Sequence, residues 1–141
     1  MDKSEKLDYL VSDGFLAYLG FRLVEWDLDY AVMELTIGPQ HLNRHQSLHG
    51  GVLTALIDSV AGFSGLYSPH GRLRKGVTLS MTTSFTGRAS SGIIRATGRK
   101  RAGGKNIFVS TVEVINDNAE IIAIGEATYR YLNSSSTDLD K

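Results

Sequence analysis

The chain of 141 residues contains no cysteine and only two prolines, and its fifteen basic and fifteen acidic residues cancel in net charge. The absence of cysteine excludes disulfides, thiolate zinc sites and cysteine nucleophiles. The lack of net charge argues against nucleic acid as the main partner. Residues 1–13 are charged, and no apolar run reaches signal-peptide or membrane-span length. We therefore expect a soluble, cytoplasmic protein that does not bind membranes.

The remaining pattern predicts one domain over residues 1–141, with a core at about 15–132 and a polar, disordered tail at 133–141. Residues 4–19 carry apolar side chains near helical spacing, which predicts a short amphipathic helix. Residues 51–66 are apolar or small on almost every side, which is typical of a long buried helix rather than a surface helix.

The other segments predict an antiparallel sheet of about six strands curled around the long helix, an α+β plan. In the third strand, apolar and polar side chains alternate, which places Val77, Leu79 and Met81 on one face and Thr78 and Ser80 on the other. Turns join the first two strands as a hairpin and the last four as a hairpin-linked meander. One sheet face stays partly uncovered, which favours an oligomer. The predicted strands are Phe21–Asp27, Tyr30–Ile37, 77–85, Ile93–Arg101, Asn106–Ile115 and Glu120–Leu132.

The most informative segment begins at Asn43 and ends in His49, Gly50 and Gly51, where the long helix starts; Asp58 then interrupts the apolar run. A helix N-terminus offers unpaired N–H groups to an anion, and glycine lets a substrate approach them closely. A lone acid in apolar surroundings is costly unless it is paired, bonded or used. These are the parts of a site that stabilises an oxyanion and supplies a base or nucleophile.

Helix geometry separates these parts. Asp58 is eight residues beyond Gly50, so the two lie ~12 Å apart along the axis and ~80° apart around it. An aspartate side chain cannot span that distance. If both residues act on one carbonyl, they come from different chains, with two helices antiparallel across a two-fold axis.

This motif and the order of elements resemble the hotdog-fold acyl-CoA thioesterases typified by the phenylacetyl-CoA (PaaI-type) enzymes. In that family an Asn precedes a His-Gly-Gly and an Asp follows within the helix, here Asn43, His49 and its two glycines, and Asp58. Thr78 fits the small hydroxyl residue on the next strand. Gln46 departs from the family, since relatives often have glycine there. The resemblance covers essentially the whole domain and implies the same composite dimer.

The resemblance implies hydrolysis of an acyl-CoA thioester, without a cofactor. The Gly50 N–H would stabilise the oxyanion, with Asn43 or His49 as a second donor or as the group that orients the loop. Asp58 would act as a general base on water or attack directly to form a mixed anhydride. Thr78 would position the water. The acyl group, and the choice between a homodimer and a dimer of dimers, stay open.

The phosphates of coenzyme A need cations, and two basic clusters could supply them at the rim of the site. One cluster flanks the Gly103-Gly104 hairpin, and the other precedes the third strand. The first consists of Arg99, Lys100, Arg101 and Lys105, and the second of Arg72, Arg74 and Lys75.

A metal site is a weaker interpretation of the same region. His41, His45 and His49 are spaced four apart and could line one helical face. The segment has no nearby cysteine or acid, and glycines on both sides favour a loop. We therefore expect no metal.

Two other functions remain possible on a hotdog scaffold. A hydratase or dehydratase also pairs a histidine with an acid across a dimer, but this chain lacks the Pro-Gly helix start of that branch. A non-catalytic acyl-CoA-binding protein would have no evident use for Asp58.

Overall fold

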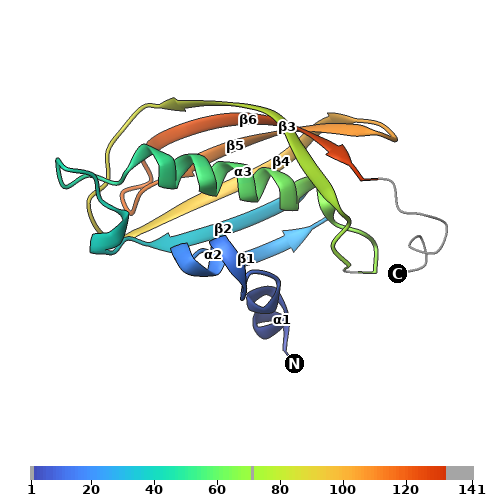
Figure 1. Ribbon diagram of the computed structural model, residues 1–141, viewed down its shortest axis with the longest axis horizontal. Coiled ribbons are helices and arrows are strands. Elements are labelled where there is room, and N and C mark those ends of the chain that lie inside the picture. Colours follow the sequence, from blue (N-terminus) through green and yellow to red (C-terminus); the bar gives the residue numbers. More distant parts are fainter. Residues whose placement is uncertain (1, 71, 133–141) are drawn as a thin grey trace.

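The computed structural model describes residues 2–70 and 72–132, and the tail predicted at 133–141 lies outside them. The described part is a six-stranded antiparallel sheet with one long helix against it, so the predicted α+β plan is confirmed (Figure 1). The elements are α1 Lys3–Leu10, α2 Gly14–Leu19, β1 Arg22–Asp27, β2 Tyr30–Thr36, a 3-10 turn Pro39–His41, α3 Gly50–Leu66, β3 Gly76–Phe85, β4 Ile93–Gly103, β5 Ile107–Ile115 and β6 Ile121–Tyr131.

The strand order is β1-β2-β4-β5-β6-β3. The predicted β1–β2 hairpin is confirmed, but the predicted four-strand meander is wrong, because β3 pairs with β6 and not with β4. After β3 the chain crosses the end of the sheet, where the N–H groups of Thr86 and Gly87 both donate to the Ile122 carbonyl. Glycine-rich segments signal a change of direction without specifying which strand the chain joins next.

The long helix α3 is buried along most of its length, as the sequence predicts. Leu56, Ile57 and Val60 have no exposed surface, and they pack in the core between α3 and the sheet. The approach to β4 is close enough that a Cβ on Gly98 would lie 2.7 Å from the Val60 carbonyl oxygen. At the far end, the Trp26 indole N–H donates to the Phe63 carbonyl at 2.7 Å. The second half of the helix that carries the candidate site is therefore held closely by the sheet.

The helix predicted over residues 4–19 is in fact two helices. α1 ends at Leu10, and α2 starts anew after Asp13, whose carboxylate accepts the N–H of Gly14. Asp13 is extended, and Gly14 at the start of α2 has a left-handed φ of +69°, so the chain turns between the two helices. No helix within residues 2–70 and 72–132 is long and apolar enough to cross a membrane.

A β-bulge in β3 changes which of its residues face α3. Val77 pairs with Arg130 and Thr78 with Tyr129, but the register then shifts, so that Ser80 pairs with Thr128. The strict alternation predicted for this strand is therefore wrong. Thr78 faces the helix, and so does Met81, which packs against the core. An extra residue in one strand of a pair changes the phase of everything beyond it.

Candidate active site

The loop before α3 is folded around Asn43. Its side-chain oxygen accepts the N–H groups of His45 at 2.8 Å and Ser47 at 3.1 Å, and its own N–H donates to the Ser47 carbonyl at 2.7 Å. Because the oxygen is engaged, the side-chain NH₂ is directed away from these bonds, and it has no acceptor among the described residues. Asn43 thus both shapes the loop and offers a donor.

Gln46, at the position where relatives often have glycine, has a φ of +62°. This left-handed conformation is strained for a residue with a Cβ and free of strain for glycine. The Gln46 N–H donates to the Asn43 carbonyl at 3.1 Å. The departure from the family pattern therefore keeps a turn of the kind glycine favours and adds local strain.

His49 caps the start of α3. Its Nδ1 accepts the Gly51 N–H at 2.8 Å, so a neutral ring carries its proton on Nε2, as a second donor. The Gly51 N–H is consumed by this bond. The N–H of Gly50, the first residue of α3, has no acceptor in the part of the chain that the structure describes. Gly50 is thus the backbone donor that remains available at this helix end.

A hollow of about 490 Å³ lies at this end of α3. A Cβ on Gly50 would lie 3.3 Å from the ring of Phe85, which forms one wall. Arg88, which sequence reasoning missed, donates to the Ser47 hydroxyl from Nη2 at 2.7 Å and adds a positive charge beside the donors. Asp58 does not line this hollow. Its lining residues are Asn43, His45, Ser47, Leu48, Gly50, Leu53, Phe85, Gly87, Arg88 and Ala89.

Asp58 is half-buried in the middle of α3 and is held by two hydroxyl groups. Thr78 on β3 donates to its Oδ1 at 2.6 Å. Tyr129 on β6 donates to the same Oδ1 at 2.7 Å and also contacts the Asp58 backbone carbonyl. No Lys, Arg or His within residues 2–70 and 72–132 forms an ion pair with this carboxylate. The acid is therefore positioned by neutral donors.

Tyr129 is the second functional candidate that sequence reasoning missed. Its side chain is buried and its ring stacks on Phe108, with 5.2 Å between centroids. Burial raises the pKa of Tyr129 well above its usual range; the adjacent Thr78 hydroxyl lowers it, and the hydrogen bond and charge of Asp58 raise it further. The phenol stays protonated and remains a donor. Nothing in the local sequence marks it, since 71 positions separate it from Asp58.

The predicted coenzyme A residues on β4 lie on the face of the sheet away from α3. Gly98 faces the helix, so its neighbour Arg99 faces the opposite side, where its guanidinium stacks over Tyr30 at 4.8 Å. Arg101 donates to the Thr111 hydroxyl at 2.7 Å and lines the same outer groove as Arg99. Within one chain, neither arginine is on the side of the sheet that carries Asp58. Their assignment to coenzyme A stays a prediction.

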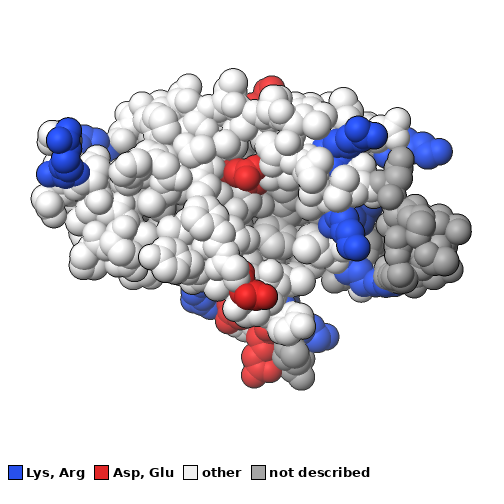
Figure 2. All heavy atoms as spheres, viewed as in Figure 1, with Lys and Arg blue, Asp and Glu red and all other residues white. Residues whose placement is uncertain are grey.

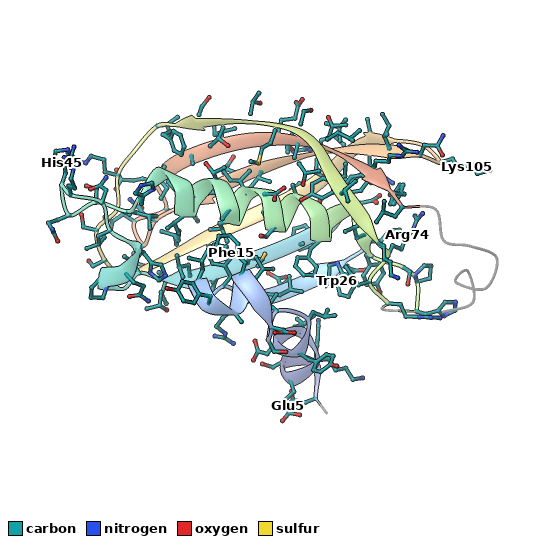
Figure 3. The ribbon with its side chains drawn as sticks, in the orientation of Figure 1. Glu5, Phe15, Trp26, His45, Arg74 and Lys105 are labelled. Atoms are coloured by element: carbon teal, nitrogen blue, oxygen red, sulfur yellow. The ribbon has the colours of Figure 1, made fainter. Side chains whose placement is uncertain are left out.

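The second basic cluster lies beyond the C-terminal end of α3. The Arg74 guanidinium stacks over the Tyr131 ring at 3.7 Å, and the Tyr131 hydroxyl donates to the Gly65 carbonyl at 2.9 Å. Arg74 and Lys105 lie at the end of the molecule opposite His45 (Figure 3). Figure 2 shows Lys and Arg mainly at the two ends of the long axis, with smaller groups near the lower helices, and an acidic group among uncharged residues in the middle of the face.

The three histidines considered for a metal do not share a face. The predicted loop is confirmed: only Pro39–His41 forms a short 3-10 turn before α3. The His41 ring is buried, with Nδ1 accepting the Gly38 N–H at 2.9 Å and Nε2 bonded to the Leu19 carbonyl at 2.7 Å. The described residues contain no group of three or more His, Asp or Glu that could hold a metal ion.

Known proteins with the same architecture place this geometry in a family. A family model described as "Thioesterase superfamily" matches residues 45–123. The acyl-coenzyme A thioesterase PaaI of Escherichia coli (strain K12) is 29% identical over 114 residues, covering 80% of this chain and 79% of the relative.

Two solved structures support the same assignment. That of zebrafish thioesterase superfamily member 2 has a TM-score of 0.80 at 26% identity, covering 92% of this chain and 95% of the other. The Escherichia coli PaaI structure has a TM-score of 0.79 at 24% identity, covering 94% and 96%. The predicted resemblance to hotdog-fold thioester hydrolases of the PaaI type is thereby confirmed. Because the family model matches more than half of the 141 residues, the chain belongs to the thioesterase superfamily.

Proposed function

We propose that this protein hydrolyses acyl-CoA thioesters at two equivalent sites of a homodimer, each uniting Gly50 of one chain with Asp58 of the other. One observation carries the proposal: free N–H donors lie at the start of α3, and the acid lies eight residues further along the same helix. A separation of ~12 Å along the axis prevents both from reaching one carbonyl within a chain. Two antiparallel copies of α3 would bring each half next to the other.

The free edge of β3 supports a dimer. Within the described residues β3 pairs with a strand on one side only, and it is ten residues long. Leu79 and Phe85 on this strand are each 54% exposed. A long apolar edge strand is a template for further pairing and is normally covered. A second copy related by a two-fold axis covers it and sets the two α3 helices antiparallel.

The chemistry follows from these groups. The Gly50 N–H, aided by the Asn43 NH₂ or the His49 Nε2–H, polarises the thioester carbonyl and stabilises the oxyanion. The Asp58 carboxylate removes a proton from water, whose oxygen bonds to the carbonyl carbon. The oxyanion then collapses, the C–S bond breaks, and the sulfur leaves with the proton held by Asp58. In the alternative route, Asp58 attacks the carbon itself, and water later cleaves the mixed anhydride.

The antiparallel arrangement also favours a location for the coenzyme A phosphates. Leu66 ends α3 eight residues beyond Asp58, ~12 Å along the axis. In the dimer, the basic end of one chain therefore extends past the donor half of the other. We propose that Arg74 and Lys105, with Arg72 and Lys75, meet the phosphates there. Arg99 and Arg101 face the other side of the sheet and could contribute only where a substrate reaches around its edge.

The reaction itself is tested with a panel of aliphatic and aromatic acyl-CoAs by detecting free thiol. We expect thiol release by the wild type and a loss of about 10²–10⁴-fold in Asp58→Ala, the range for removal of a general base. Equal rates for the two proteins would refute the role of Asp58. Binding of acyl-CoA without thiol release across the panel would instead identify a non-catalytic binding protein.

The composite site is tested by mixing two inactive variants. Asn43→Asp damages the donor half and Asp58→Ala damages the acid half, so a mixed dimer contains one intact site and one doubly damaged site. After unfolding and refolding together, an equal mixture should recover about a quarter of the wild-type activity, since half of the dimers formed at random are mixed. No recovery, while each variant still dimerises, would show that both groups act within one chain.

A further inference from the structure

We propose that Tyr129 and Thr78 are positioning residues that together hold Oδ1 of Asp58 and leave Oδ2 as the reacting oxygen. The inference rests on the proposed function of Asp58 and specifies its geometry at the level of atoms. It also changes the role predicted for Thr78. Its hydroxyl orients the acid, whereas the sequence suggested that it orients the water.

Both hydroxyls donate to the same carboxylate oxygen. Thr78 lies 2.6 Å and Tyr129 2.7 Å from Oδ1. No described residue donates to Oδ2. A carboxylate oxygen that already accepts two hydrogen bonds has little lone-pair density left for a proton or a carbon, and the second oxygen retains its own. The bonds therefore make the two oxygens of Asp58 inequivalent.

Tyr129 fixes the backbone and the side chain of Asp58 at once. Its hydroxyl also contacts the Asp58 carbonyl, which in a regular helix accepts the N–H of Gly62 one turn later. Gly62 makes this approach possible, because a Cβ there would lie 2.8 Å from the Tyr129 hydroxyl oxygen. One phenol thus links the side-chain torsion of Asp58 to the backbone of α3.

The donors that hold Asp58 come from separate strands whose register is fixed. Thr78 and Tyr129 are directly paired across β3 and β6, immediately before the β-bulge. The stacking of Tyr129 on Phe108 anchors the phenol from the third strand, β5. Both hydroxyls are neutral, so they orient the carboxylate without an ion pair.

The first experiment measures kcat and KM separately for Tyr129→Phe and Thr78→Val. We expect kcat of each variant to fall by about 10- to 100-fold, as for groups that orient metal-binding side chains. KM should stay near the wild-type value, because neither hydroxyl contacts the substrate in this proposal. Thr78→Ser keeps the hydroxyl and should restore kcat. A loss carried by KM with kcat unchanged would overturn the proposal.

Tyr131→Phe is the matched control. Tyr131 also lies on β6, packs beside Phe108 and donates to a carbonyl of α3, but its partner is Gly65. Phenylalanine keeps the ring on which Arg74 stacks. The variant should lose stability comparable to that of Tyr129→Phe while retaining the wild-type kcat. A similar loss of kcat in Tyr131→Phe would show that the effect is one of general destabilisation.

A second readout does not depend on turnover. The hydroxyl proton of Tyr129, assigned by its absence in Tyr129→Phe, should appear downfield in the proton NMR spectrum and move strongly upfield in Asp58→Asn. An unmoved resonance would refute the bond to Asp58. If the wild type releases no thiol but the resonance moves, the proposed function fails and the hydrogen-bonded arrangement stands.

Discussion

The start and the middle of α3 carry the two halves of the proposed site, and they are built in different ways. At Gly50 the functional groups are backbone and loop donors around an open hollow, and they are set by contacts within nine residues of sequence. At Asp58 the functional group is one half-buried side chain, which accepts hydrogen bonds from hydroxyl groups on two strands. The first half is local and accessible, and the second is non-local and tightly held.

This contrast shows how one helix can serve both functions. Free N–H groups occur only at a helix end, so an oxyanion donor belongs there. A base needs a fixed orientation and a partly dry environment, which the sheet supplies beside the middle of α3. Neither place suits the other task, and the proposed dimer would bring the two into one site.

Within the donor half, the largest effect is expected from Asn43→Asp, which tests whether that half depends on the NH₂ of Asn43. Aspartate keeps an oxygen for the N–H groups of His45 and Ser47 but replaces the donor with a negative oxygen. We expect kcat to fall by about 10²–10³-fold, as for loss of an oxyanion donor. Unfolding in urea should show nearly wild-type stability. A small loss of activity would restrict Asn43 to shaping the loop.

Gly62→Ala tests the contacts between Tyr129 and Asp58 in the acid half. The added Cβ would displace the Tyr129 hydroxyl from Asp58. We expect a rate loss of about 10-fold or more, with overpacking that costs about 1–3 kcal/mol in the free energy of unfolding. The rate losses of Gly62→Ala and Tyr129→Phe should not add in the double variant, because both act through one hydroxyl. Additive losses would show that Gly62 does not act through the Tyr129 hydroxyl.

Alkaline pH probes the burial of Tyr129. The pKa of Tyr129 is raised in the folded protein. The folded protein therefore keeps the phenol proton at a pH above about 10, the usual pKa of tyrosine, where the unfolded chain releases it. Stability from this group is therefore complete below pH ~10 and falls above it, by about 1.4 kcal/mol per pH unit. Chemical denaturation from pH 9 to 11 should show a steeper decline for wild type than for Tyr129→Phe. Parallel declines would mean that the phenol ionises freely.

The smallest effect is expected at Gln46, in the donor half. Its φ of +62° suits glycine, so Gln46→Gly should remove strain and stabilise the protein by up to ~1 kcal/mol, less the entropy that glycine adds to the unfolded chain. Thermal unfolding measures the change, and Gln46→Ala serves as the control that keeps a Cβ. A destabilised glycine variant would show that the Gln46 side chain supports the loop.

The two halves also differ in how far the sequence predicts them. The donor half lies within residues 43–51, so its motif and the family resemblance together indicate Asn43, His49 and Gly50, and local hydrogen bonds join the loop to the start of α3. Asp58 is indicated by the same motif and by its apolar surroundings. Tyr129 could not be found in this way, because its role depends on which strand lies beside Thr78, and local patterns do not fix that.

The fold shows the same division. Periodicity located the six strands and the buried helix, since each depends on neighbouring residues. It missed the pairing of β3 with β6, because that is a contact between distant segments. It also missed the break next to Gly14, where the backbone leaves the right-handed helical conformation. The outward direction of Arg99 follows from the phase of β4 against α3, which only the assembled sheet defines.

The β-bulge between Thr78 and Ser80 separates two tasks within one strand. Residues before it present a hydroxyl to the acid, and residues after it, such as Met81, pack on the core. Because the phase is reset between them, mutations in the core-packing part need not rotate Thr78 away from Asp58. The strand therefore has two parts separated by one extra residue, and the part that packs on the core can be altered without changing the part that holds the acid.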